Sequence, residues 1–183
     1  VVDGANHRVQ RFDAAGNFLS QLGTGTSGAG NGVFNTPQGV AVNQVDGSVY
    51  VTDGGNFRVQ RFTSAGAFDR AWGWDVDSTG GSPTTFEVCV APAVCKIGLA
   101  GAGDGQFGTA FTGYPAVDPG SGAVYVADPA TANRRVQRFG ALGSFELKFG
   151  TAGAAEGQFG GTSPSKVAVD SGGAVYAIDI GNN

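Results

Sequence analysis

A seven-residue phrase that occurs three times constrains this chain more than any other feature. It reads NHRVQRF at residues 6–12, NFRVQRF at 56–62 and NRRVQRF at 133–139. Read as a β-strand, its successive side chains face opposite ways, so Val9 and Arg11 share one face and Arg8, Gln10 and Phe12 share the other. Turn residues and a further short apolar segment follow each copy. The chain therefore repeats one small β-structural unit, and its fold must place equivalent units in equivalent surroundings.

Each unit extends on both sides of the phrase and predicts four short strands. In the first complete unit we expect them at about 38–43, 48–53, 58–63 and 67–72, bounded by Gly, Asp and Asn. Repeated four-stranded sheets of about 45 residues are typical of β-propeller blades. The predicted fold class is therefore all-β, a propeller of four-stranded antiparallel blades, with roughly three blades present.

The repeat pattern divides the chain into four blade segments and one long insert. We expect a partial blade at 1–23, blades at 33–73 and 105–150, a partial blade at 157–183 and an insert loop at 74–104. A closed ring of three is not expected, because blade twist favours about 4 to 8 blades. The chain is either an excerpt of a longer propeller or a half-ring that pairs with a second copy. Open blade edges would then promote self-association.

The segment GVFNTPQGVAVNQVDGSVYVTDGGNFRVQRFTSAGAFDRAWG, at 32–73, resembles an NHL repeat almost end to end. The shared pattern is Phe-x-x-Pro-x-Gly-Val-Ala-Val, then Val-Tyr-Val-x-Asp, then Asn-x-Arg-Val-Gln-x-Phe. The resemblance implies a six-bladed ring, of which this chain would supply half. The unit at 105–150 departs from the pattern, because TGYPAVDP replaces the Pro-x-Gly-Val-Ala-Val segment.

We interpret the repeated phrase as scaffold. Asp53 and Asp128 end the strand that precedes the phrase. Arg58 and Arg135 follow within the phrase itself, so an Asp–Arg pair could fix each blade in the same way. The alternative is a ring of Asp ligands around the channel, but a residue present in every blade is explained more simply by what every blade needs. His7 is the only histidine, which leaves no second imidazole for a triad or a His-rich metal centre.

The insert contains both cysteines of the chain, Cys89 and Cys95. Their spacing is one that a surface loop can close as a disulfide. The alternative is a zinc pair, but zinc needs about four ligands and the chain offers few others. A disulfide implies an oxidising compartment, so an extracellular or cell-surface location is expected.

The insert is also the longest of the loops expected on one face of the propeller. Long loops that are held by a cross-link are commonly functional. Its aromatic and charged side chains suit contact with a protein or a glycan. The alternative is that the insert only covers the blade and packs on itself. The candidate binding residues are Trp74, Asp75, Asp77, Phe86 and Lys96.

A calcium hypothesis concerns the start of the insert. Asp75, Asp77 and Thr79 stand at alternate positions before a glycine, as the first ligands of a calcium loop do. The closing Glu should fall at the twelfth position, which is Phe86, and Glu87 is one residue late. A solvated turn is the alternative. The sequence indicates no other cofactor.

Charge and motifs exclude several function classes. The formal net charge of −4 argues against electrostatic binding of nucleic acid over a broad surface. No apolar run approaches the roughly 20 residues that span a bilayer, so no membrane insertion is expected. No nucleophile–base pair, paired carboxylates or phosphate loop is recognisable, which favours a binding protein over an enzyme. The leading hypothesis is a secreted interaction scaffold for protein or glycan. The alternatives are part of a metal-centred lyase or hydrolase, and a subunit of an extracellular filament or envelope layer.

Overall fold

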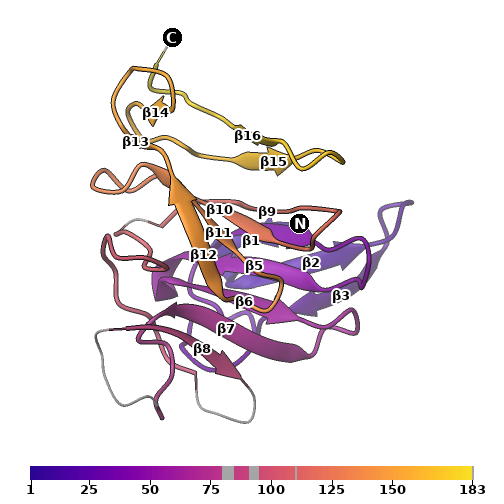
Figure 1. The fold of residues 1–183 in the computed structure, drawn as a ribbon. Coiled ribbons are helices and arrows are strands. Elements are labelled where there is room, and N and C mark those ends of the chain that lie inside the picture. Colours follow the sequence, from indigo (N-terminus) through magenta and orange to yellow (C-terminus); the bar gives the residue numbers. More distant parts are fainter. Residues whose placement is uncertain (80–84, 91–94, 110, 183) are drawn as a thin grey trace.

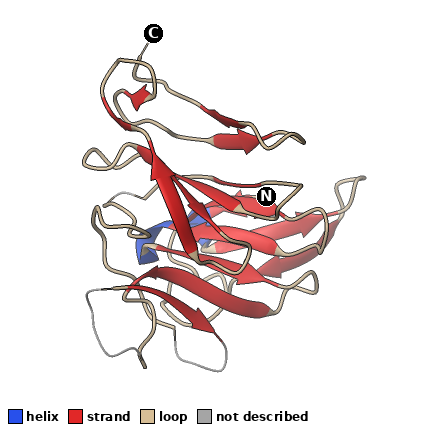
Figure 2. Ribbon diagram, viewed as in Figure 1, coloured by secondary structure: helices blue, strands red, loops and turns tan. Residues whose placement is uncertain are grey.

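The computed structural model of the chain describes residues 1–79, 85–90, 95–109 and 111–182, and its regular structure is almost entirely β-strand, in sheets that are antiparallel apart from one two-stranded pair (Figures 1 and 2). The described helical structure is two single turns of 3₁₀-helix, η1 (Gly4–Asn6) and η2 (Gly54–Asn56). The all-β fold class predicted from the repeat pattern is confirmed.

The central sheet contains the first complete repeat unit. Its strands follow one another in space in the order of the sequence, each antiparallel to the last. They are β4 (Pro37–Val42), β5 (Val49–Asp53), β6 (Arg58–Phe62), β7 (Phe68–Trp74) and β8 (Phe86–Val90). The first four correspond to the expected strands. Such a meander is the architecture of a propeller blade.

The insert differs from the loop that we expected, because it adds β8 as a fifth strand on the outer edge of this sheet. Trp72 pairs with Val88, and Trp74 pairs with Phe86. The physical reason lies in the sequence FEVCV, in which Phe86, Val88 and Val90 stand at alternate positions and two of the three are β-branched. Strand β7 runs on to Trp74 and gives β8 a full-length partner.

The second complete unit forms a four-stranded meander on the same plan. Its strands are β9 (Pro115–Val117), β10 (Val124–Asp128), β11 (Arg135–Phe139) and β12 (Phe145–Phe149). The innermost strand β9 has three residues where β4 has six. It is shortened in the part of the repeat where the sequence departs from the pattern.

The remaining strands form smaller sheets at the two ends of the chain. One sheet joins β1 (Val2–Asp3), β2 (Arg8–Phe12) and β3 (Phe18–Leu22), and another joins β15 (Val167–Val169) and β16 (Val175–Ala177). A parallel pair, β13 (Thr151–Ala152) and β14 (Gln158–Phe159), lies between them in sequence. The first strands of successive sheets are neighbours, with β1 beside β4, β4 beside β9 and β9 beside β15. The sheets thus stack around an axis as a partial, unclosed propeller.

Aromatic side chains fill the space between the two complete blades. Trp72 is fully buried, with its ring centroid 6.0 Å from Tyr50 and 5.9 Å from Phe139. Val59 belongs to the same cluster, and Phe62 fills the next space, against Phe34. The two faces of the repeated phrase therefore serve two different interfaces. Burial of each large apolar side chain contributes about 1.5–3 kcal/mol.

A register shift recurs where the repeated phrase ends. It lies between Arg11 and Phe12 in the first sheet, and between Arg61 and Phe62 in the second. The third sheet has the same shift at the equivalent pair, Arg138 and Phe139. A bulge increases local twist, so the repeated phrase encodes blade curvature as well as pairing.

Candidate binding face

The Asp–Arg pair of the repeated phrase is the centre of a buried hydrogen-bond network. In the first complete blade, Asp53 and Arg58 lie directly opposite each other at the end of the β5–β6 hairpin. Asp53 Oδ2 accepts hydrogen bonds from Arg58 Nε at 3.0 Å, Asn56 Nδ2 at 2.8 Å and Gln60 Nε2 at 2.9 Å. Its Oδ1 accepts one from the backbone N–H of Asn35 at 2.7 Å. The carboxylate thus accepts hydrogen bonds from the turn and the second strand of its own hairpin and from the preceding loop.

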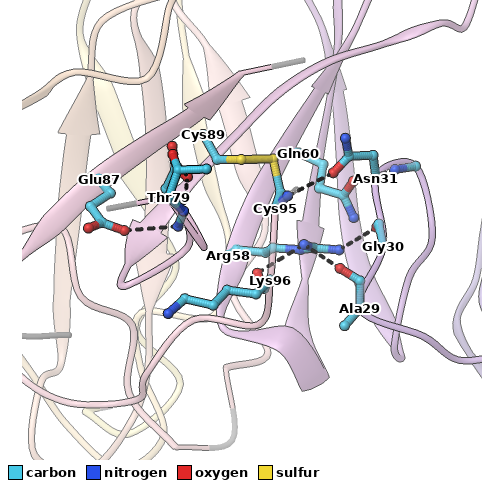
Figure 3. Close-up of a disulfide and its surroundings, with 12 residues drawn as sticks. Ala29, Gly30, Asn31, Arg58, Gln60, Thr79, Glu87, Cys89, Cys95 and Lys96 are labelled. Carbon is cyan, nitrogen blue, oxygen red and sulfur yellow. Dashed lines mark hydrogen bonds between the residues drawn. A yellow bond between two sulfur atoms is a disulfide. The ribbon is translucent and has the colours of Figure 1, made fainter. Parts of the chain in front are cut away.

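The guanidinium of Arg58 fastens neighbouring loops to the blade (Figure 3). Its Nη1 donates to the carbonyl of Ala29 at 2.8 Å and to that of Lys96 at 3.0 Å. Its Nη2 donates to the carbonyls of Gly30 at 2.9 Å and Val33 at 3.0 Å. One buried side chain therefore ties the loop before the blade and the insert after it to the same strand.

Burial works against the charges of this pair. Desolvation raises the pKa of the Asp53 carboxyl, and the Arg58 charge and the hydrogen bonds oppose that rise. Desolvation likewise lowers the pKa of Arg58, against the attraction of Asp53. Every polar partner of Asp53 named above is an N–H donor, which suits the ionised carboxylate. The hydrogen bonds of the network replace those that water would make to an exposed ion pair.

The next blade repeats the network. Asp128 Oδ2 accepts from Asn133 Nδ2 at 2.7 Å and from Arg135 Nε at 3.2 Å. Arg135 donates to three carbonyls of the loop 101–106, and Gln137 Nε2 shares the last of them. Burial raises the pKa of Asp128 as it does that of Asp53. These four residues hold the incoming loop to the blade, which is a structural role.

The first sheet contains a more exposed version of the pair. Arg8 Nε donates to Asp3 Oδ2 at 2.9 Å, with side-chain exposures of 32% and 22%. The corresponding values for Arg58 and Asp53 are both 0%. The same motif therefore occurs in this chain in a buried and a partly solvated setting.

The variable residue before each repeated Arg adopts a left-handed backbone. The φ angles are 49° at His7, 50° at Phe57 and 41° at Arg134. The sequence gives no signal of this conformation beyond the turn residues that precede it in each copy. His7 Nδ1 accepts a hydrogen bond from the backbone N–H of Thr36 at 3.0 Å, so its neutral form carries the proton on Nε2. His7 thus connects the first sheet to the start of the second.

Cys89 and Cys95 form a disulfide that ties the insert together (Figure 3). Both are buried, and they pack with Ala71 and Val76 beside strand β7. The backbone N–H of Cys95 donates to Asn31 Oδ1 at 3.2 Å. The insert is therefore anchored both to its own blade and to the loop before that blade.

Three of the candidate binding residues lie at the base of the insert. Lys96 Nζ is 2.7 Å from Asp75 Oδ1, in a partly exposed ion pair. The backbone N–H of Leu99 donates to the carbonyl of Trp74 at 2.9 Å. The ring of Trp74 is half-buried and leaves no room for a side chain at Gly103, where a Cβ would lie 2.8 Å from it. Asp75 and Lys96 are therefore in direct contact, and Trp74 precedes Asp75 in the chain with its ring against Gly103.

Phe86, a further candidate binding residue, is placed differently. Its ring stacks on Phe139 with the centroids 6.0 Å apart and meets Phe145 at 6.4 Å. Because β8 pairs with β7 in register, Phe86 is directed into the space between blades. The pairing of β8, which the sequence analysis did not anticipate, determines this placement.

The proposed calcium ligands are engaged with protein groups. Asp75 faces Lys96, whereas Asp77 Oδ1 accepts from the backbone N–H and the hydroxyl of Thr79. The carboxylate of Glu87 accepts from the backbone N–H of Asp77 at 2.8 Å. Within the ranges that the structure describes, no group of three or more His, Cys, Asp or Glu side chains is placed to hold a metal ion. A cation here would have to displace Lys96 from Asp75.

A pocket of about 690 Å³ is lined by residues of β1 and η1, of the start of β4, and by Tyr114 just before β9. Its walls combine small apolar side chains with an amide and a phenol. Among its lining residues are Thr36, Pro37, Gln38, Val40 and Tyr114. Among the described segments, no helix has the length and apolarity needed to cross a membrane.

Comparison with known proteins identifies the repeat. Residues 34–62 match the family model of the NHL repeat. None of the curated proteins matches the chain. Among solved structures, the chain is similar to the crystal structure of selenomethionine-substituted virginiamycin B lyase from Staphylococcus aureus, with 10% identity and a TM-score of 0.45. The similarity covers 97% of this chain and 58% of the lyase chain, so this chain spans less than two thirds of that protein.

Proposed function

Because the chain carries an NHL repeat within a partial β-propeller, we propose that it is a secreted or surface-displayed interaction scaffold. Its partner is a protein or a glycan, and the insert at 74–104 forms the contact surface. In this proposal the blade segments 33–73 and 105–150 serve as the support. The observation that carries the proposal is the insert, which is anchored at several points yet keeps apolar side chains in solvent.

The exposed apolar groups of the insert support a contact role. Val90 is 41% exposed, Ile97 is 47% exposed and Leu99 is 43% exposed. The disulfide and Arg58 hold the backbone beside them, so little conformational freedom would be lost on binding. Trp74 and Lys96 lie nearby and offer the aromatic and charged contacts that interfaces favour.

The repeated network supports a scaffold rather than a catalytic role. The buried acids of the complete blades, Asp53 and Asp128, are occupied by Arg, Asn and backbone donors of the same motif. Neither is free to act as a general base or a metal ligand without dismantling its blade. The disulfide is consistent with an oxidising location, where such bonds persist.

The proposal is tested with the full chain as the probe. Surface plasmon resonance against cell-surface extract fractions, together with a glycan array, should give saturable binding to a defined protein or glycan. Leu99→Asp should weaken that binding at least roughly tenfold, since hot-spot residues commonly contribute 2 kcal/mol or more. The matched control is Val45→Asp, at a residue 79% exposed in the turn between β4 and β5.

Two results would contradict the proposal. One is binding that Leu99→Asp and Val45→Asp affect equally. The other is turnover of a lyase or hydrolase substrate without any saturable partner. Light scattering of the free chain separates partner binding from self-association through blade edges, which would raise the mass in the absence of any partner.

A further inference from the structure

One position of the repeat changes from glycine to tyrosine to lysine in successive blades. Sheet pairing establishes the equivalence, because Val42, Val117 and Val169 each pair with the valine that begins the next strand. Counting back three residues from each gives the equivalent set Gly39, Tyr114 and Lys166. Glycine occupies this position only in the first of these three segments.

Gly39 and Lys166 each lie next to Tyr114. A Cβ on Gly39 would lie 2.5 Å from Pro115 Cδ and 2.9 Å from the Cα of Tyr114. The glycine therefore lets Tyr114 approach the neighbouring blade closely. On its other side, Lys166 Nζ lies 5.0 Å from the centroid of the Tyr114 ring. Such a cation–π contact positions the ammonium group without neutralising it.

Tyr114 also forms part of the wall of the 690 Å³ pocket, and its side chain is 37% exposed. The size is within the range of about 300–1,000 Å³ that is usual for small-ligand sites. The polar lining residues beside Tyr114 are Thr36 and Gln38, and Gln38 Nε2 donates a hydrogen bond to the carbonyl of Thr36 at 3.1 Å. Pro37 and Val40 supply an apolar wall. Lys166 is exposed and is not itself a lining residue, but its ammonium group lies against the ring of Tyr114, which is one.

We propose that this pocket binds a sugar that carries a carboxylate, of the uronic acid type. The carboxylate is held by the Lys166 ammonium and the Tyr114 hydroxyl, and the sugar hydroxyls meet Gln38 and Thr36. One ammonium group matches one carboxylate charge, whereas a phosphate dianion is better served by the paired donors of an arginine. The inference rests on the proposed function, because it names the glycan class and adds a site apart from the insert.

The proposal is tested by calorimetric titration of the full chain with D-glucuronate. D-glucose and inorganic phosphate are the comparison ligands. Glucuronate should bind, and both comparison ligands should bind at least about tenfold more weakly, since a charge-assisted hydrogen bond contributes roughly 1.5–3 kcal/mol. Lys166→Gln should reduce glucuronate affinity about tenfold, and Lys166→Arg should retain most of it.

Tyr114→Phe provides a second variant that keeps the ring beneath Lys166 and removes only the hydroxyl. It should weaken glucuronate binding roughly threefold to tenfold. Unchanged thermal unfolding of each variant shows that the fold is intact. The proposal is wrong if wild-type chain does not bind glucuronate, if glucose or phosphate binds equally well, or if Lys166→Gln binds as wild type does.

The two proposals fail in distinguishable ways. Leu99→Asp, on the insert, should leave glucuronate binding unchanged, because Leu99 is not part of the pocket wall. If the insert binds a protein partner but the pocket does not bind glucuronate, only the inference about the sugar fails. If glucuronate binds but no partner recognises the insert, the insert proposal fails and the pocket remains.

Discussion

Arg58→Ala is expected to destabilise the fold far more than Arg8→Ala, although both residues occupy the same position of the repeated phrase. The side chain of Arg58 is inaccessible to solvent and donates to Asp53 and to four backbone carbonyls. Its removal leaves the carboxylate of Asp53 buried without its counter-charge. Breaking a buried pair in this way costs about 3–5 kcal/mol.

Arg8 provides the matched control. Its pair with Asp3 has the same Nε–Oδ2 geometry, 2.9 Å against 3.0 Å. Both partners are partly solvated, so water replaces what the mutation removes. Exposed pairs of this kind contribute roughly 0–1 kcal/mol. The expected difference between the two variants is therefore about 2–5 kcal/mol, with the sequence motif held constant.

The measurement is urea unfolding followed by tryptophan fluorescence, since Trp72 is buried between the complete blades. Arg58→Lys keeps the charge and loses the planar fork, so it should fall between wild type and Arg58→Ala. Equal losses for Arg8→Ala and Arg58→Ala would refute the reasoning, as would an Arg58→Ala loss below about 1 kcal/mol. If Arg58→Ala is too unstable to purify, the Lys variant still supports the comparison with Arg8→Lys.

Three further changes test other parts of the structure. Gly39→Ala should cost about 1–3 kcal/mol by overpacking, because the new methyl group would lie 2.5 Å from Pro115 Cδ, and urea unfolding measures it. Replacing both Cys89 and Cys95 with serine should lower the free energy of unfolding by about 2 kcal/mol, and limited proteolysis should then cleave the insert first. Hydrogen bonds from Ser121 and from backbone N–H groups lower the pKa of Asp118 below its ordinary value of 3.8. The ionised Asp118 carboxylate therefore stabilises the fold above that value, and this stabilisation is lost as pH falls through the folded pKa. Between pH 5 and pH 3, Asp118→Asn should lose less unfolding free energy than wild type does, and urea unfolding at each pH measures the difference.

The sequence predicts the fold where local chemistry determines it. Alternation of side chains places the strands, and turn residues close the hairpins, so the four strands of the first complete blade could be located in advance. The Asp53–Arg58 pair could be anticipated for the same reason, because the two residues flank one short hairpin turn. The disulfide follows from the spacing of Cys89 and Cys95.

Features that depend on neighbouring blades could not be predicted in this way. Phe86 reads as an exposed loop residue until the pairing of β8 with β7 directs it between blades. The contact of Tyr114 with Lys166 joins residues far apart in sequence, and only the stacking of β9 beside β15 brings them together. The left-handed backbone of His7 depends on a turn that several residue types can adopt, so its side chain carries little signal.

Whether the repeated phrase fastens each incoming loop to its own blade is tested most directly by native-state hydrogen exchange. The amides of Gly32 and Asn35 donate to Gln60 and Asp53 in one blade, and those of Gly105 and Gly108 donate to the equivalent residues of the next. In Arg58→Ala, exchange at Gly32 and Asn35 should accelerate, while exchange at Gly105 and Gly108 stays as in wild type. Unchanged protection at Gly32 and Asn35, or an equal loss at all four amides, would contradict it.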